Sequence, residues 1–147
     1  MESSSPARIL VVAHQTAATP QLVEAVRERA ARGPAVFTLL VPKLAHGMHR
    51  VVDAEDLGTD HEEQVIAKAR PLLEDAAGAQ VEGIVGDHNP LDAVQDAVNM
   101  RGFDEIIIST LPHRVSRWLK LDLPSKLSGL GLPITTVTAD EEAGTTA

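Results

Sequence analysis

The sequence contains no cysteine and very few aromatic side chains: two phenylalanines, one tryptophan and no tyrosine in 147 residues. The absence of cysteine excludes a disulfide scaffold, a thiolate nucleophile and a cysteine-ligated zinc site. No apolar run approaches the ~18 residues that a membrane-spanning helix needs. The first residues show no charged segment followed by a long apolar stretch, so no signal peptide is evident. We therefore expect a cytoplasmic protein with an aliphatic core.

The sequence is acidic: it has 13 lysines and arginines and 21 aspartates and glutamates, which gives a formal net charge of -8. This balance argues against general nucleic-acid binding, which usually shows a basic footprint. The length is that of one domain and is sufficient to bury a core without disulfides or metal. We expect one domain over residues 8–138, a disordered N-terminus over 1–7 and an acidic disordered tail over 139–147.

Several catalytic and cofactor motifs are missing. No G-x-G-x-x-G follows the first predicted strand, and no Walker motif is present. Ser109 and Ser116 lack the G-x-S-x-G context of a nucleophile elbow. The sequence therefore favours a binding or regulatory protein over an enzyme.

Short runs rich in β-branched residues alternate with segments of helical periodicity. Each run is short, apolar and bounded by polar or turn residues, as in a strand that is buried on both faces. Hydroxyl or amide caps followed by proline at Thr19-Pro20 and Asn89-Pro90 predict helix starts, and Thr59 to Glu62 fits a capping box. Pro71 is expected to kink the helix that contains it. The alternation predicts a doubly wound α/β domain, a parallel sheet with helices on both faces, with strands at 9–13, 35–41, 80–85, 105–109 and 133–137.

The carboxyl ends of the strands are the expected ligand-binding edge, because open parallel sheets bind ligands there. The segment after the fourth strand carries the one dense basic cluster of this acidic chain, around its single tryptophan, Trp118. Arginines in this segment would give bidentate contacts to a phosphate or carboxylate. Alternatively, the basic residues form a solvated or dimer-facing surface on which Trp118 is a packed anchor. The candidate ligand-binding residues are His14, Gln15, Val41, Gly86, Asp87, Ser109, Thr110, His113, Arg114 and Arg117.

Histidines follow several of the predicted strands. His14, His88 and His113 come after strand ends, and His46 and His49 lie in the loop that leaves the second strand. Imidazole is the commonest metal ligand in proteins, so these histidines together suggest a metal site at the same edge. The alternative is that they are exposed polar residues of loops. Asp87 has a similar pair of interpretations, as a ligand-binding group or as a cap of the helix that begins at Pro90.

Four segments resemble the universal stress protein family. They are the apolar run 9–13, the turn Gly86-Asp87 leading to Pro90, the run 103–108 and Leu132-Pro133-Ile134 before the last strand. The resemblance spans roughly residues 8 to 138. It implies a five-stranded parallel sheet of order 3-2-1-4-5, a homodimer paired through the last strand and, as in many members, ATP binding.

The chain departs from the ATP-binding members of that family at two places. An aspartate ends their first strand, whereas here Ala13 and His14 stand there. Their glycine-rich motif after the fourth strand is replaced by Ser109-Thr110-Leu111-Pro112, so the backbone cradle that glycines provide for phosphates is absent. The basic side chains would then take over phosphate binding, with Val12 and Val41 flanking an adenine slot.

Three hypotheses follow for the function. The first is a non-catalytic, stress-associated or regulatory protein that binds ATP, another nucleotide or a different small anion. The second is a homodimeric interaction module whose nucleotide pocket is lost, and the third is a metal-binding protein. Because an exposed edge strand favours pairing with a second chain, we expect a homodimer through Ile134, Thr135, Thr136 and Val137.

Overall fold

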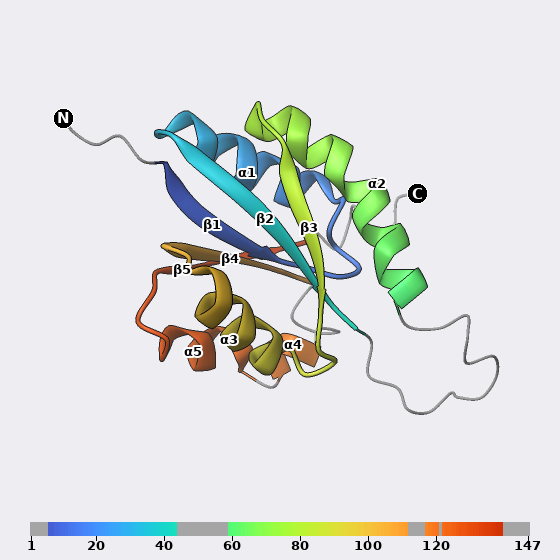
Figure 1. The fold of residues 1–147 in the computed structure, drawn as a ribbon, viewed down its shortest axis with the longest axis vertical. Helices are drawn as coiled ribbons and strands as arrows, with labels where there is room; N and C mark the ends of the chain where they lie inside the picture. The colour runs from blue at the N-terminus through green and yellow to red at the C-terminus, as the bar shows by residue number, and fades with distance from the viewer. Residues whose placement is uncertain (1–5, 44–58, 112–116, 121, 140–147) are drawn as a thin grey trace.

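A five-stranded parallel sheet forms the centre of the protein (Figure 1). The computed structural model describes residues 6–43, 59–111, 117–120 and 122–139. The strand order is β3-β2-β1-β4-β5, which confirms the predicted doubly wound topology. The strands are β1 (Ala7–Val12), β2 (Ala35–Pro42), β3 (Val81–Gly86), β4 (Glu105–Thr110) and β5 (Ile134–Thr138).

Helices cover both faces of this sheet (Figure 1). α1 and α2 pack on one face, and α3, α4 and α5 lie on the other. None of the described helices is long and apolar enough to span a membrane. The helices are α1 (Pro20–Ala31), α2 (Thr59–Ala77), α3 (Pro90–Arg101), α4 (Arg117–Lys120) and α5 (Leu123–Ser128).

The core is divided between the two faces by the alternation of side chains along each strand. In β1, Ile9 and Val11 pack toward α1 and α2, whereas Leu10 and Val12 pack toward α3 and α5. All four side chains are fully buried. The central strand is therefore apolar at every one of these positions, as expected of a strand that is covered on both faces.

The predicted helix starts are confirmed at α1 and α3. The Thr19 hydroxyl accepts a hydrogen bond from the Leu22 amide at 3.4 Å, and Asn89 Oδ1 accepts from the Leu91 and Asp92 amides at 3.0 and 3.2 Å. Proline follows each cap at the first helical position, where its missing N–H costs nothing. α2 runs uninterrupted through Pro71, whose side chain is exposed.

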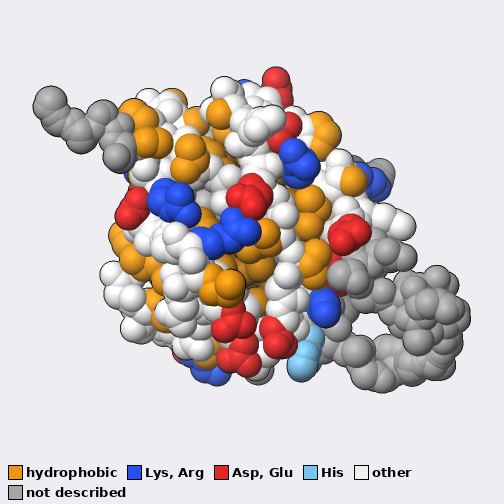
Figure 2. All heavy atoms as spheres, viewed as in Figure 1, with side chains coloured by type: hydrophobic (Ala, Val, Ile, Leu, Met, Phe, Trp, Pro, Cys, Tyr) orange, Lys and Arg blue, Asp and Glu red, His pale blue; other side chains and the backbone are white. Residues whose placement is uncertain are grey.

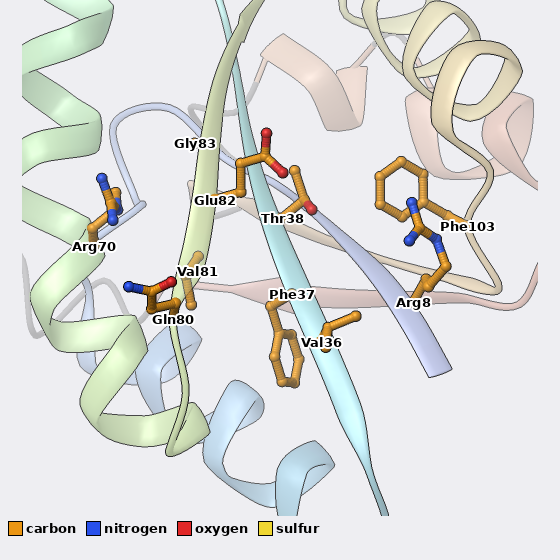
Figure 3. Close-up of a pocket in the computed structure, with 10 residues that line it drawn as sticks. All are labelled: Arg8, Val36, Phe37, Thr38, Arg70, Gln80, Val81, Glu82, Gly83 and Phe103. Atoms are coloured by element: carbon orange, nitrogen blue, oxygen red, sulfur yellow. The ribbon is translucent and has the colours of Figure 1, made fainter. Parts of the chain in front are cut away.

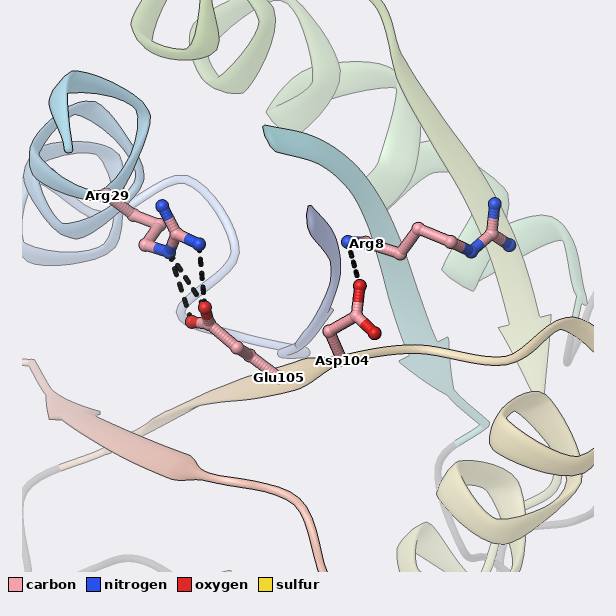
Figure 4. A network of polar contacts seen from close by, with 4 residues as sticks. All are labelled: Arg8, Arg29, Asp104 and Glu105. Carbon is pink, nitrogen blue, oxygen red and sulfur yellow. Dashed lines mark hydrogen bonds and ion pairs between the residues drawn. The ribbon is translucent and has the colours of Figure 1, made fainter. Parts of the chain in front are cut away.

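Charged residues join the elements at the amino edge of the sheet, the edge at which the strands begin (Figure 4). Arg29, in the last turn of α1, donates hydrogen bonds of 2.7 to 3.1 Å to both carboxylate oxygens of Glu105, the first residue of β4. These hydrogen bonds raise the pKa of Arg29 above its ordinary value. Asp104 accepts from the Arg8 amide at 2.8 Å. The Asp104-Glu105 pair of the family-like segment therefore has a structural role here, far from the carboxyl edge.

Candidate functional site

Most of the predicted site residues lie at the carboxyl edge of the sheet. His14 and Gln15 follow β1, Val41 lies near the end of β2, and Gly86 ends β3. Ser109 and Thr110 are the last two residues of β4, and Asp87 follows β3. His113 and Arg114 lie outside the described residues, as do His46 and His49. Arg117 begins α4, and its side chain is likewise outside the described part.

His14 is turned toward the beginning of α2. Its Nε2 lies 2.9 Å from Oε2 of Glu62, and the two side chains are only 8% and 1% exposed. The ring also stacks on His61, with centroids 5.4 Å apart and planes inclined by 27°. His14 Nδ1 is buried and has no hydrogen-bond partner among the described residues. His14 therefore joins β1 to α2.

Hydroxyl groups line the edge between β1 and β4. Thr16 Oγ1 and Ser109 Oγ lie 2.6 Å apart, and both side chains are buried. Thr110, the next residue, is 1% exposed, and its Oγ1 has no hydrogen-bond partner within the described part of the chain. Burying a hydroxyl without a partner costs roughly 1–3 kcal/mol. Thr110 is thus a polar group whose hydrogen-bonding capacity the described protein leaves unused.

Two predicted site residues near the ends of β2 and β3 have packing roles. The Val41 side chain is fully buried against α1 and α2, whereas Val12 is buried on the α3 and α5 face. The two valine side chains therefore do not face each other across an adenine slot. At Gly86, an added Cβ would lie 2.7 Å from the Cβ of Ala93 and 2.8 Å from Leu40 Cδ1. Gly86 is needed because α3 approaches β3 so closely.

Asp87 supports the turn before α3 but is not its cap. Its Oδ1 accepts a hydrogen bond from the Asn89 amide at 3.1 Å, and Asn89 itself caps the helix. Oδ1 also lies 3.0 Å from His88 Nδ1, with both side chains well exposed. His88 is therefore paired with its neighbour in sequence, and the metal hypothesis receives no support from this histidine.

The described residues place a lysine and the tryptophan near this edge. Lys43 directly follows β2, and its side chain is exposed. Trp118 is half-buried and packs against the core on the α3 and α5 face, as the anchor interpretation expected. On the face shown in Figure 2, basic and acidic side chains are interspersed with apolar ones.

His61 and Glu62 are the site residues that sequence reasoning did not identify. They lie in the first turn of α2, and each offers a ligand atom beside His14. A topological signal was available. In a β-α-β crossover the helix after β2 begins at the carboxyl edge, so the first turn of α2 lies at the same edge of the sheet as the end of β1.

A pocket of about 510 Å³ lies at the other end of the sheet, near the start of β2 and β3 (Figure 3). Arg8 and Phe103 line one side, and Arg70 and Gln80 line another. The Arg8 guanidinium donates to the carbonyls of Gly102 and Arg101 at 2.8 and 3.0 Å and lies over the Phe103 ring. Arg70 is paired with Glu74 at 3.1 Å. These arginines already have partners in the fold.

The architecture is that of a doubly wound α/β domain with a five-stranded parallel sheet. Comparison with solved structures identifies the fold more closely as that of the universal stress proteins. No protein-family model matches the sequence, and no curated protein matches it.

Three universal stress protein structures illustrate the similarity. The protein from Archaeoglobus fulgidus superposes with a TM-score of 0.63 at 15% identity, over 89% of this chain and 93% of that chain. The same organism's protein in complex with dAMP gives 0.58 at 13% identity, over 90% and 98%. A universal stress protein in complex with cAMP also gives 0.58 at 13%, over 92% of this chain and 100% of that chain. The expected fold is thereby confirmed.

Proposed function

We propose that the protein is a non-catalytic, cytoplasmic regulatory protein of the universal-stress-protein type that binds a nucleotide or another small phosphate-bearing anion at the carboxyl edge. Proteins of the same fold have been solved in complex with cAMP and with dAMP. The cysteine-free composition requires no oxidising compartment. The observation that carries the proposal is the buried hydroxyl of Thr110, which has no partner among the described residues.

The unused hydroxyl of Thr110 supports this proposal. A hydroxyl offers one donor and two acceptor positions, so a phosphate oxygen or a ribose hydroxyl at the end of β4 would satisfy it. Ser109, beside it, shares its hydroxyl hydrogen bond with Thr16. Among the described residues that bond joins two hydroxyls, with no histidine or carboxylate in it to act as a base. This arrangement favours binding over nucleophilic catalysis.

Cationic side chains would supply the charge that a phosphate requires. Lys43 is exposed after β2 at this edge, and Arg114 and Arg117 come after β4 in the sequence. Guanidinium groups bind phosphate through paired hydrogen bonds, so they can replace the backbone amides of a glycine-rich loop. The proposed site therefore relies on side-chain charge where a glycine motif would use amides.

The test is a titration with ATP, AMP and cAMP, followed by calorimetry and by the fluorescence of the single tryptophan, Trp118. We expect saturable binding by the native protein and a loss of at least tenfold in affinity for the double variant R114A/R117A. Thr110→Val, which removes one hydrogen bond worth about 1 kcal/mol, should weaken binding about fivefold. Arg32→Ala is the matched control, because Arg32 is an exposed residue at the C-terminus of α1, at the opposite edge. Unchanged affinity in the double variant would refute the proposed site.

A homodimeric interaction module is the alternative, and the edge strand β5 favours it. β5 pairs with β4 on one side, and in the described part of the chain no strand pairs with its other side. Ile134 and Val137 are half-buried, and Thr135 and Thr136 are exposed. We propose that two copies pair through these residues, because an unpaired strand edge readily accepts a second strand.

Light scattering coupled to size-exclusion chromatography measures this association. We expect a particle of twice the 15.6 kDa of one chain. Thr136→Lys should shift it toward monomer, because the twofold axis places like charges near each other across the paired strands. Gln95→Lys, on the exposed surface of α3, should not. A dimer that binds none of the three nucleotides would favour the interaction module. A monomeric native protein would exclude pairing through β5.

A further inference from the structure

Three side chains with metal-binding chemistry meet where β1 ends and α2 begins. His14 follows β1, and His61 and Glu62 are neighbours in the first turn of α2. One ligand atom from each of the three lies within 4.8 Å of the others. His14 and Glu62 are buried, whereas His61 is exposed. The cluster therefore has two buried side chains and one accessible side chain.

The buried half already has nearly the spacing that a bound ion requires. Nε2 of His14 and Oε2 of Glu62 are 2.9 Å apart. Two ligand atoms on a tetrahedral zinc ion lie about 3.3 Å apart, given bonds of about 2.0–2.1 Å. His61 is exposed and stacks on His14, so a rotamer change of its side chain, which takes picoseconds to nanoseconds at the surface, can bring its ring nitrogen to the same ion.

Charge also favours a cation at this position. Glu62 is 1% exposed, and a buried carboxylate requires compensation by a partner of opposite charge or by coordination. His14 Nδ1 makes no hydrogen bond to the described residues, so no other described group prevents the ring proton from residing there and leaving the Nε2 lone pair to the ion.

We propose that His14, His61 and Glu62 form a site for a single divalent transition-metal ion of the zinc class. Two imidazoles and one carboxylate are the donors of open zinc sites, which keep a fourth position for water or another ligand. Magnesium and calcium prefer sites made of oxygen atoms, so this donor set selects against them. The proposal stands independently of nucleotide binding, because none of the three side chains is assigned to the phosphate contacts.

The test uses the full chain, purified without a histidine tag and stripped of metal by chelation. Zn²⁺ is titrated in competition with a chromophoric chelator, and Co²⁺ is used separately because its visible spectrum reports tetrahedral coordination. We expect one ion per chain and release of protons on binding, since the ligands must be deprotonated. The ring nitrogen resonances of His14 and His61 should shift together in nitrogen-15 NMR spectra.

His61→Ala is the informative variant, because its side chain is exposed and its removal leaves the buried pair in place. It should lower zinc affinity at least tenfold, as expected for the loss of one ligand. His88→Ala is the matched control, since His88 is also an exposed histidine after a strand and is paired with Asp87. Its affinity should equal that of the native protein.

Two results would overturn the proposal: absence of zinc binding below millimolar concentration, or equal affinity in His61→Ala and the native protein. Either result would make the cluster a buried hydrogen-bonded pair with a stacked neighbour. The outcome is separable from the nucleotide titration, because that titration is run on metal-free protein and uses Arg114 and Arg117.

Discussion

Nε2 of His14 and Oε2 of Glu62 lie 2.9 Å apart in the interior, although 48 positions separate the two residues in the sequence. This contact fixes the start of α2 to the end of β1. The sequence predicted that His14 binds a ligand, but this contact pairs His14 with a side chain of the protein itself. The part of the carboxyl edge that we propose for a phosphate-bearing ligand is therefore the β4 side, where Thr110 ends the strand.

Removing Glu62 should destabilise the protein strongly. Glu62→Ala would leave His14 buried without its partner, and we expect the free energy of unfolding to fall by about 3 kcal/mol. His61→Ala, at an exposed position, should change it by no more than about 0.5 kcal/mol in metal-free protein. Urea unfolding of both variants measures the difference. Equal effects of the two substitutions would contradict the structural role assigned to Glu62.

Thr110→Val should stabilise the ligand-free protein while weakening ligand binding. Valine keeps the shape of threonine and removes a buried hydroxyl that lacks a partner, so we expect a gain of about 1 kcal/mol. Ser109→Ala should instead lose about 1 kcal/mol, because the Thr16 hydroxyl would then lose its partner. If the Thr110 hydroxyl is unsatisfied, the two substitutions should change the thermal unfolding temperature in opposite directions relative to the native protein. A destabilised Thr110→Val variant would show that the hydroxyl has a partner in the free protein.

Gly86→Ala should cost about 1–3 kcal/mol of stability, because its Cβ would press on Ala93 and Leu40. The double variant Gly86→Ala/Ala93→Gly removes the Ala93 methyl group that the new Cβ would meet. Glycine inside α3 costs about 1 kcal/mol by itself. Even so, the double variant should lose less unfolding free energy than the sum of the losses in the two single variants. Simple additivity in this double-mutant cycle would argue against close packing of α3 on β3.

Stability should decrease in acid partly through Glu74. Its carboxylate accepts a hydrogen bond from the Val81 amide at 3.0 Å and one from Arg70 at 3.1 Å. These hydrogen bonds lower the pKa of Glu74 below its ordinary value, and the bond from the Val81 amide contributes more than the bond from Arg70. Because the unfolded chain takes up this proton at a higher pH than the folded chain, the stabilisation is present at neutral pH and is lost as the pH falls through the lowered pKa.

Glu74→Gln tests this directly by denaturant unfolding at a series of pH values. The variant should be less stable than the native protein at neutral pH, and the two should converge in acid. A difference that stays constant across the series would show that Glu74 contributes no pH dependence. Asp75→Asn is the matched control, because Asp75 is the exposed neighbour of Glu74 in the same helix.

The strands and helix starts could be predicted because their signals are local. The apolar run of β1 and the caps Thr19 and Asn89 determine their elements from a few neighbouring residues. The strand order came from the resemblance to the universal stress proteins and is confirmed by the structure. Local pattern therefore accounts for most of the fold.

The side-chain contacts at the site could not be predicted in the same way. Whether Glu62 caps its own helix or reaches His14 depends on where α2 packs relative to β1. Similarly, Gly86 looked like a ligand-binding residue until the distance between α3 and β3 explained it as a packing requirement. In both cases the contact depends on where a whole helix packs against the sheet. A short sequence pattern does not specify that position.

Native mass spectrometry with added ATP, AMP or cAMP tests the central claim most directly. A bound nucleotide and a bound zinc ion differ in mass, so one spectrum separates the two proposed sites. We predict a mass excess of one nucleotide per chain for the native protein and its strong reduction in R114A/R117A. Native protein that stays free of nucleotide at saturating concentrations would contradict ligand binding at the carboxyl edge.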